Sequence, residues 1–392
     1  MIDRRTLLKG SAGLAIGSVL AGCSANAEGT LNLLLLEGAI PSVVLRSFQN
    51  QIDTPVKFQT VTQVQTAFQT LQRWQQPEAT DAWERFMPWR QSNARAASSN
   101  LVSLGDYWLT EAITQNLIEP LTLTAETLNL LPDRWQAFGR RDRNAQINSS
   151  EQLWGVPYKL QTLVVVYRQS QFPTQSGQKP FSSWQDLLAP NLYQNIALPS
   201  HPNIIIGLLQ KLQTNSFNPD TSVAETEQSL AQLEQQLAAS FDKLAPQVKT
   251  YDSSTALKAL INEDVKAVVA WSGDVDTALK RYQDLRVAIP DEGSLLSMDM
   301  WVQPKGTLLS NAAEAWVSFC WQTEPATELS ITQKGISPVF LAADSQIPET
   351  LTKAQPALSA LRKSELLFPL SKSVQSAYTK FWQQITASEL SD

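Results

Sequence analysis

The sequence predicts an α/β protein with two lobes, because strand-like apolar runs alternate with helical segments along most of the chain. The first unit is Leu31–Leu36, a continuous apolar run followed by a helical segment that begins at Pro41. Continuous apolar runs are typical of strands buried on both faces of a parallel sheet. The alternation occurs in two blocks, at 31–118 and 162–289, so each lobe is predicted to be a doubly wound sheet.

The first block continues with three further elements. Residues 56–60 alternate apolar and polar side chains, which predicts a strand, and residues 64–74 repeat apolar side chains at helical spacing. Residues 101–117 are interpreted as a strand that turns directly into a helix. The segment 77–100, which mixes tryptophans with charged residues, breaks the pattern and is interpreted as an insertion on the first lobe.

The second block contains shorter runs of both kinds. The β-branched run at 162–167 predicts a strand, and residues 204–212 predict a helix that is entered through Pro202. The other predicted elements are a short helix at 181–188, strands at 196–198, 266–271 and 285–289, and helices at 230–244, 312–321 and 374–385.

The segment 1–22 has the features of an export signal. The paired Arg4 and Arg5 precede a short apolar core, a pattern typical of twin-arginine signals. That core is shorter than the roughly 20 residues that a membrane-spanning helix needs. The segment ends on Leu-Ala-Gly-Cys, which resembles the lipobox of bacterial lipoproteins. We therefore expect an exported protein in which residues 23–30 form a tether and Cys23 carries the lipid.

Composition excludes several classes of function. The 31 Lys+Arg against 37 Asp+Glu give a net charge of −6, which disfavours nucleic-acid binding. The chain has one histidine, His201, so a histidine-rich metal site is excluded, and neither a cofactor nor a metal is expected. Common nucleotide-binding, zinc-protease and serine-hydrolase motifs are missing. Cys320 lies in an apolar helical segment and is expected to be buried rather than disulfide-bonded.

A family resemblance rests on four blocks in a set order and spacing. They are residues 101–118, residues 154–158, Trp271-Ser272-Gly273-Asp274 with Ala278, and residues 289–293 followed by Met298-Asp299. Together they resemble the extracytoplasmic solute-binding proteins of ABC importers, in the branch that includes spermidine/putrescine-binding proteins. The resemblance covers nearly the whole chain after the signal, apart from 77–100.

This resemblance implies a two-lobed periplasmic-binding-protein fold, type II-like, with a hinge between the lobes. Lobe 1 would comprise 29–158 plus 298–340, and lobe 2 would comprise 159–297 plus 341–392. The resemblance also implies a monomer that catalyses no reaction and delivers its solute to the transmembrane subunits of a permease.

The resemblance implies a ligand site between the lobes. Trp271 takes the place of an aromatic residue that packs on the polyamine chain, and Asp274 and Asp299 take the places of carboxylates that pair with its amines. Tyr107 takes the place of a tyrosine in the first lobe. Ammonium groups favour charge-assisted hydrogen bonds to carboxylates, and an aromatic face attracts a cation by about 0.5–2 kcal/mol.

Three further candidates come from the residues themselves. Glu37 follows the first predicted strand, and Asp106 precedes a helix, where it can instead act as a cap. Trp108 follows Tyr107 directly, so we expect one ring to line the site and the other to pack. Asp274 also opens a helix, and capping is its alternative role. Asp299 interrupts an apolar strand, where a charge is costly unless it is paired.

The chain departs from the polyamine-binding pattern at three places. The loop 36–41 lacks aromatic residues, the segment 199–204 lacks acids, and Ser297 stands where an aromatic residue is common. The predicted function is a periplasmic, lipid-anchored binding subunit for a polyamine, putrescine or spermidine, or a related small cation. The alternatives are a secreted, carboxylate-dependent hydrolase of carbohydrate and a non-binding scaffold lipoprotein on the same fold.

Overall fold

A computed structural model describes residues 29–75, 99–172, 179–220, 226–332, 335–342, 345–354 and 358–389. The predicted export signal, Cys23 and most of the predicted insertion at 77–100 lie outside these residues. Within them, no helix is both long enough and apolar enough to cross a membrane.

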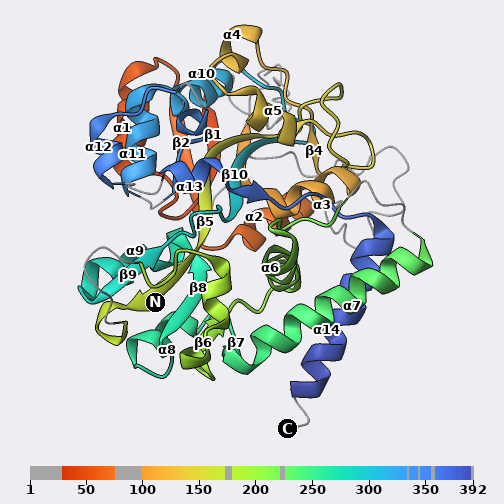
Figure 1. Cartoon of the computed structure of the whole chain (residues 1–392). Coiled ribbons are helices and arrows are strands. Elements are labelled where there is room, and N and C mark those ends of the chain that lie inside the picture. Colours follow the sequence, from red (N-terminus) through yellow and green to blue (C-terminus); the bar gives the residue numbers. More distant parts are fainter. Residues whose placement is uncertain are drawn as a thin grey trace, which may run out of the picture.

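The upper lobe in Figure 1 is built on a parallel sheet, as the first block predicts. Strand β1 (Leu31–Leu36) lies between β2 (Val56–Val61) and β3 (Leu101–Gly105), and both neighbours run parallel to it. Helices α1 (Ser42–Gln51) and α2 (Val64–Gln75) connect these strands. The leucines of β1 are almost all buried, which explains its continuous apolar sequence.

Two long strands join this lobe to the lower one. Strands β5 (Val156–Arg168) and β10 (Leu295–Pro304) pair antiparallel, and β3 pairs antiparallel with β10. In β5, Leu160 packs in the upper hydrophobic core, whereas Leu163 packs in the lower one. In β10, the change falls between Leu295 and Leu296. The single sheet therefore passes through both lobes.

The lower lobe repeats the α/β arrangement. Strand β6 (Ile196–Leu198) pairs parallel with β7 (Val248–Tyr251) and β8 (Ala267–Trp271), and β5 pairs antiparallel with β8 and β9 (Leu285–Ala288). Helix α6 (Pro202–Thr214) packs beside this sheet, with α7 (Glu227–Leu244) and α14 (Lys372–Glu389) on its outer side (Figure 1).

Local sequence signals set several boundaries. Helix α6 begins with Pro202 and ends at Asn215, whose φ of 63° is the left-handed conformation that stops a helix. The predicted short helix at 181–188 is a 3₁₀ turn, Trp184–Leu188, capped by Ser183. The helix predicted after Gly105 also opens as a 3₁₀ turn, Asp106–Trp108.

The remaining elements complete the two lobes. They are strands β4 (Ile118–Glu119) and β11 (Glu365–Leu366), and helices α3 (Leu109–Thr114), α4 (Ala125–Leu128), α5 (Asp133–Gly139), α8 (Ala256–Ile261), α9 (Ser272–Arg281), α10 (Asn311–Cys320), α11 (Thr323–Thr332), α12 (Glu349–Ala354) and α13 (Leu358–Arg362). Cys320 is fully buried at the end of α10, as expected.

The C-terminal part of the chain is shared between the two hydrophobic cores. Leu351 and Leu361 pack in the upper core, whereas Tyr378 and Phe381 pack in the lower one. The sequence placed all of 341–392 in lobe 2, but the side chains up to Leu366 contribute to the upper core instead. The lobe boundaries stay a prediction, and we propose that the third crossing lies just after Leu366.

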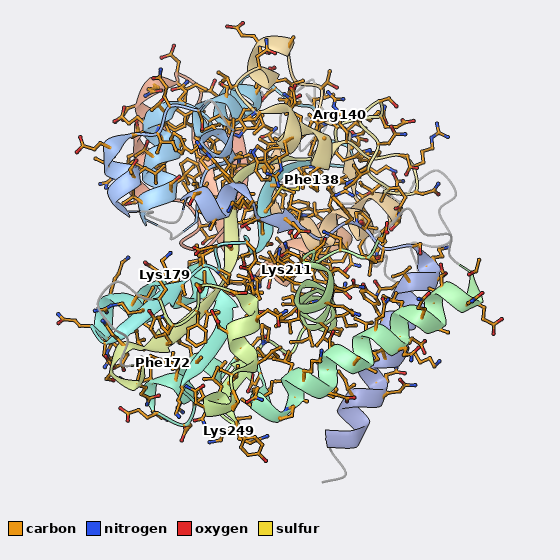
Figure 2. The ribbon with its side chains drawn as sticks, in the orientation of Figure 1. Phe138, Arg140, Phe172, Lys179, Lys211 and Lys249 are labelled. Carbon is orange, nitrogen blue, oxygen red and sulfur yellow. The ribbon has the colours of Figure 1, made fainter. Side chains whose placement is uncertain are left out.

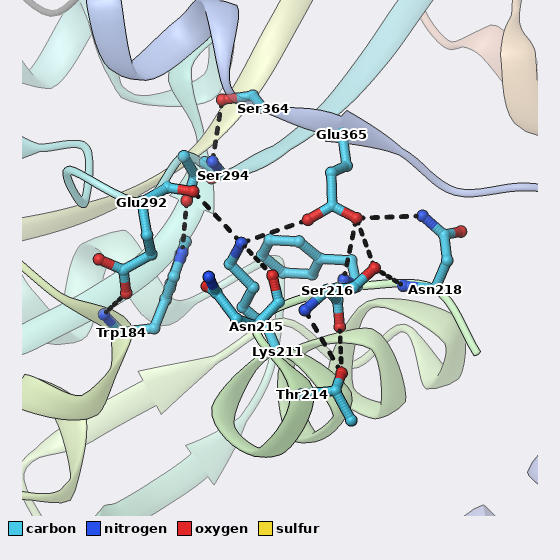
Figure 3. A network of polar contacts seen from close by, with 12 residues as sticks. Trp184, Lys211, Thr214, Asn215, Ser216, Asn218, Glu292, Ser294, Ser364 and Glu365 are labelled. Carbon is cyan, nitrogen blue, oxygen red and sulfur yellow. Dashed lines mark hydrogen bonds and ion pairs between the residues drawn. The ribbon is translucent and has the colours of Figure 1, made fainter. Parts of the chain in front are cut away.

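A polar network holds this third crossing against the lower lobe (Figure 3). Glu365 of β11 forms an ion pair with Lys211 of α6, with 3.2 Å between Oε1 and Nζ. Its other carboxylate oxygen accepts hydrogen bonds from Ser216 Oγ, Phe217 N and Asn218 Nδ2. The Lys211 ammonium also donates to backbone carbonyls of Asn215 and Glu292.

Candidate ligand site at the junction of the lobes

Strand topology brings the carboxyl ends of strands from both lobes to one junction. Glu37 follows β1 and Asp106 follows β3 in the upper lobe, while His201 follows β6 and Trp271 ends β8 in the lower lobe. Ligands of open α/β sheets bind outside the carboxyl ends of the strands. We call this set, together with Tyr107 and Asp274, the junction site.

A ring contact joins the two lobes at this site. Tyr107 of the upper lobe meets His201 of the lower lobe edge to face, with 4.9 Å between the ring centroids. Tyr107 is still 56% exposed, so its ring has surface available to a ligand. Trp108 instead stacks on Phe68 of α2, with 4.4 Å between the centroids. Trp108 therefore packs against the upper core while Tyr107 stays exposed, and we leave Trp108 out of the junction site.

Asp106 bonds to a crossing strand. Ser297 of β10 donates a hydrogen bond from its hydroxyl to Asp106 Oδ1 over 2.9 Å. Gly105, not Asp106, occupies the cap position of the following 3₁₀ turn. Burial raises the pKa of Asp106 to about 6, and the neighbouring negative charge of Asp299 adds to this rise. Asp106 is therefore an acid that changes its charge near pH 6.

Asp299 has a counter-ion within the protein. Its Oδ2 lies 2.9 Å from Nζ of Lys159, and the two side chains are only 9% and 3% exposed. Both residues are register partners in the β10–β5 pair, so their side chains point to the same face of the sheet. The family resemblance assigns a ligand amine to Asp299, and a charge in an apolar strand is costly unless it is paired. The structure supplies Lys159 as its partner.

Trp271 and Asp274 lie where the lower lobe meets the crossing strands. Trp271 is half-buried beside Leu163 of β5, and the next residue, Ser272, accepts a hydrogen bond from the backbone N–H of Thr162. Asp274 lies in the first turn of α9, on the exposed side, and desolvation raises its pKa. Trp271, and not Asp274, holds the cap position of α9.

Glu37 occupies the turn that follows β1 and is exposed. Its backbone N–H donates to the carbonyl of Val61, so the turn is held at the edge of the sheet. The register of β1 with β3 places this turn next to Gly105 and Asp106. Glu37 and Asp106 therefore share one edge.

Sequence reasoning named neither Lys159 nor His201 as a site residue. Lys159 is a charged residue inside the apolar strand β5, which is the same signal that drew attention to Asp299. His201 occupies the cap position of α6, and burial lowers its pKa. A buried guanidinium, Arg141, also contributes, because it lies close enough to Asp106 for favourable electrostatic attraction.

Across the described ranges, no three His, Cys, Asp or Glu side chains are grouped closely enough to hold a metal ion. The junction site contains three carboxylates and the rings of Trp271 and Tyr107, and the Asp299–Lys159 pair of the crossing strands adds one internal cation. This combination suits an organic ligand that carries positive charge and a short apolar spacer.

Comparison with known proteins finds a family model that matches residues 37–360. Its description is bacterial extracellular solute-binding protein. The match includes β5 and β10, the two long strands that join the lobes.

Two curated relatives match parts of the sequence. The chain is 22% identical over 213 residues to the spermidine/putrescine-binding periplasmic protein 1 of Haemophilus influenzae. It is 24% identical over 238 residues to the putrescine-binding periplasmic protein SpuD of Pseudomonas aeruginosa. These alignments cover 53% and 57% of this chain, and 56% and 59% of the relatives.

A solved structure resembles the whole fold. It is the spermidine/putrescine ABC transporter substrate-binding protein PotD of Streptococcus pneumoniae, with a TM-score of 0.68 and 18% identity. The match covers 92% of this chain and 99% of that one. The fold is thus a two-lobed periplasmic-binding-protein fold, as predicted.

Proposed function

The chain belongs to the family of bacterial extracellular solute-binding proteins, and from this premise we propose that it is the substrate-binding subunit of an ABC importer. The observation that carries the proposal is the pair of facing strand edges, which the Tyr107–His201 contact brings together. In such a fold, a solute held between the lobes stabilises the closed arrangement. The closed protein would then present both lobes to the permease.

We propose a polyamine, putrescine or spermidine, or a related small cation as the solute. Both curated relatives have names that specify putrescine, alone or with spermidine. Asp106, Asp274 and Glu37 can supply the carboxylates for an ammonium group, and Trp271 and Tyr107 can supply flat walls for its methylene spacer. Their facing positions support this assignment.

The binding role excludes catalysis in this proposal. A carboxylate-dependent hydrolase would need one acid as proton donor and a second as base or nucleophile on opposite sides of a sugar. Asp299, which would be a candidate for one of them, is neutralised by Lys159. Family membership and this ion pair favour a binding protein over a hydrolase.

We propose that the protein acts as a monomer.

We also propose that the protein is anchored in the periplasm by a lipid on Cys23. The twin-arginine pattern and the Leu-Ala-Gly-Cys ending of the segment 1–22 support export and lipidation. A tether of residues 23–30 would leave the two lobes free to open and close near the permease.

A thermal-shift panel tests the proposed function. The solutes are putrescine, spermidine, spermine, several amino acids, sugars and ferric ion. A solute at 100 times its dissociation constant should stabilise the protein by about 2.7 kcal/mol. Stabilisation by an amine supports the proposal, whereas stabilisation by a sugar alone contradicts the ligand class. If none of the solutes changes the melting temperature, the result favours the non-binding scaffold.

A further inference from the structure

Lys159 places an ammonium group beside Asp299, one of the carboxylates expected to bind the ligand. The group lies 2.9 Å from Asp299, at the position where the family resemblance places a ligand amine. Its side chain is 3% exposed, so this is an internal ion pair and not a surface contact. A carboxylate that is already paired with a buried lysine gains little from binding a second cation, because its negative charge is already compensated.

The lysine is held in this position by the fold. Lys159 and Asp299 face each other across the antiparallel pair of β5 and β10, next to a register shift after Asp299. Gly335 leaves room for the lysine stem, because a Cβ at that position would lie 2.9 Å from Lys159 Cγ and 2.7 Å from the Leu160 carbonyl oxygen. The backbone therefore accommodates this long side chain at the crossing.

The charges around the pair balance. Lys159 and Arg141 contribute two buried cations, and Asp299 and Asp106 contribute two acids. A ligand with two ammonium groups would bring two positive charges, which the outer acids Asp274 and Glu37 can offset in number. Its second ammonium would find Asp299 already paired with Lys159, and it would bring a further positive charge towards that buried lysine. Like charges brought together out of water disfavour binding.

We propose that Lys159 is a specificity-determining residue that takes the place of one ligand ammonium, so that the junction site prefers a short ligand with a single positive charge and a neutral polar end. This inference rests on the proposed function, because it concerns the solute of the same site. The remaining ammonium would pair with Asp106 or Asp274, and the apolar spacer would contact Trp271. The neutral end would lie towards Lys159.

The test compares two amines of equal length in three proteins. Isothermal titration measures putrescine and 4-amino-1-butanol on the wild type, on Lys159→Met and on the control Lys249→Met. Methionine keeps most of the lysine stem and removes the charge. Lys249 lies at the lower edge of the molecule, far from the junction (Figure 2).

The wild type and Lys249→Met should bind aminobutanol at least as tightly as putrescine. Lys159→Met should reverse this order by about tenfold or more, because Asp299 then gains a charge-assisted hydrogen bond with the second ammonium. Lys159→Arg keeps the cation and should keep the wild-type order. The double variant Lys159→Met/Asp299→Asn removes both charges, and it should show no gain for putrescine even if Lys159→Met alone folds poorly.

Two contrary outcomes are separable. An equal preference for putrescine in the wild type and in Lys159→Met overturns the role of Lys159 and leaves the proposed function standing. Failure of every protein to bind either amine, with a sugar or no solute active in the thermal-shift panel, overturns the proposed function and this inference with it.

Discussion

At the residue scale, the junction site and the crossing strand β10 beside it carry acids in two different electrostatic states. Asp299 is neutralised by Lys159, whereas Asp106 is held by a serine hydroxyl and has a pKa of about 6. The sequence alone does not distinguish these two aspartates, since each lies at a position where a ligand could bind. Their partners decide which of them remains able to respond to a cation.

The raised pKa of Asp106 predicts that cation binding depends on pH. Asp106 is largely protonated below about pH 6 and ionised above it. Affinity for a cationic ligand should therefore rise as pH increases from 5 to 7, by up to about tenfold per pH unit below the pKa. Titration calorimetry at several pH values measures this, and Asp106→Asn should remove the dependence. A wild-type affinity that falls over the same interval contradicts the assignment.

The Lys159–Asp299 pair predicts a stability effect for Asp299→Asn. The substitution leaves the Lys159 ammonium buried without a charged partner, which should lower the free energy of unfolding by about 3–5 kcal/mol. Urea denaturation measures the loss. Lys159→Met/Asp299→Asn should recover part of it, because no uncompensated charge remains. An unchanged unfolding midpoint for Asp299→Asn would show that the pair is not formed in solution.

At the scale of elements, helix α6 and strand β11 join the third crossing to the lower lobe. Lys211 has a side chain that is 2% exposed, and its ion pair with Glu365 lies within the network in Figure 3. Asn218 adds a second attachment, because its amide donates to the Leu366 carbonyl and accepts from the Phe368 N–H. If the lobes move relative to each other, we expect the bending on the upper side of this attachment or within β5 and β10.

Lys211→Met should destabilise the protein by about 3 kcal/mol. This loss of stability is at the low end of the range for breaking a buried ion pair. The reason is that Glu365 is 25% exposed and keeps three other hydrogen-bond donors. Thermal or urea denaturation measures the change. Lys249→Met, at an exposed site, is the matched control and should remain within about 0.5 kcal/mol of the wild type. Equal effects of the two substitutions would mean that the network contributes nothing specific.

At the scale of the whole molecule, one continuous sheet connects two hydrophobic cores. The upper core draws on residues 31–160 and 296–366, whereas the core of the lower lobe is mostly formed by residues 163–295 and by the C-terminal helix α14. Few chain segments cross between the lobes, whereas each lobe has its own hydrophobic core. We therefore expect the lobes to move relative to each other more easily than either lobe deforms. Tyr107 and His201 mark where the two surfaces touch.

The shape of the junction predicts a size preference among polyamines. The loop 36–41 offers buried Ala39 and Ile40 but no aromatic wall, so Trp271 and Tyr107 are left to hold the spacer. Putrescine should therefore bind more tightly than spermine, which also brings additional positive charges next to Lys159. Competitive titration of the two amines decides the order. Tighter binding of spermine would refute the size argument.

Membrane attachment depends on a single cysteine in the proposed scheme. Cys23→Ala should block processing at that position, abolish incorporation of labelled fatty acid and release or mislocalise the protein. Metabolic labelling followed by membrane fractionation measures both effects. Cys320→Ala provides the control, because Cys320 is fully buried and should not affect labelling. Normal labelling of Cys23→Ala would place the lipid elsewhere or exclude it.

The sequence alone determined the class of the fold and most of its elements. Apolar periodicity is a local property, so β1, β2 and β3, the helices between them and the buried Cys320 could all be predicted from neighbouring residues. The two blocks of alternation indicated two lobes. The motif at 271–274 and the acid in β10 pointed to the region where the lobes meet.

Only the tertiary structure decided which charges meet. Lys159 and Asp299 are distant in the sequence, and their contact depends on the antiparallel register of β5 and β10. The same holds for Tyr107 with His201 and for the leucines after 341 that join the upper core. Register and packing are non-local, and no periodic pattern encodes them. The sequence could therefore identify Asp299 as a charge that needs a partner, while the fold determined that this partner belongs to the protein itself.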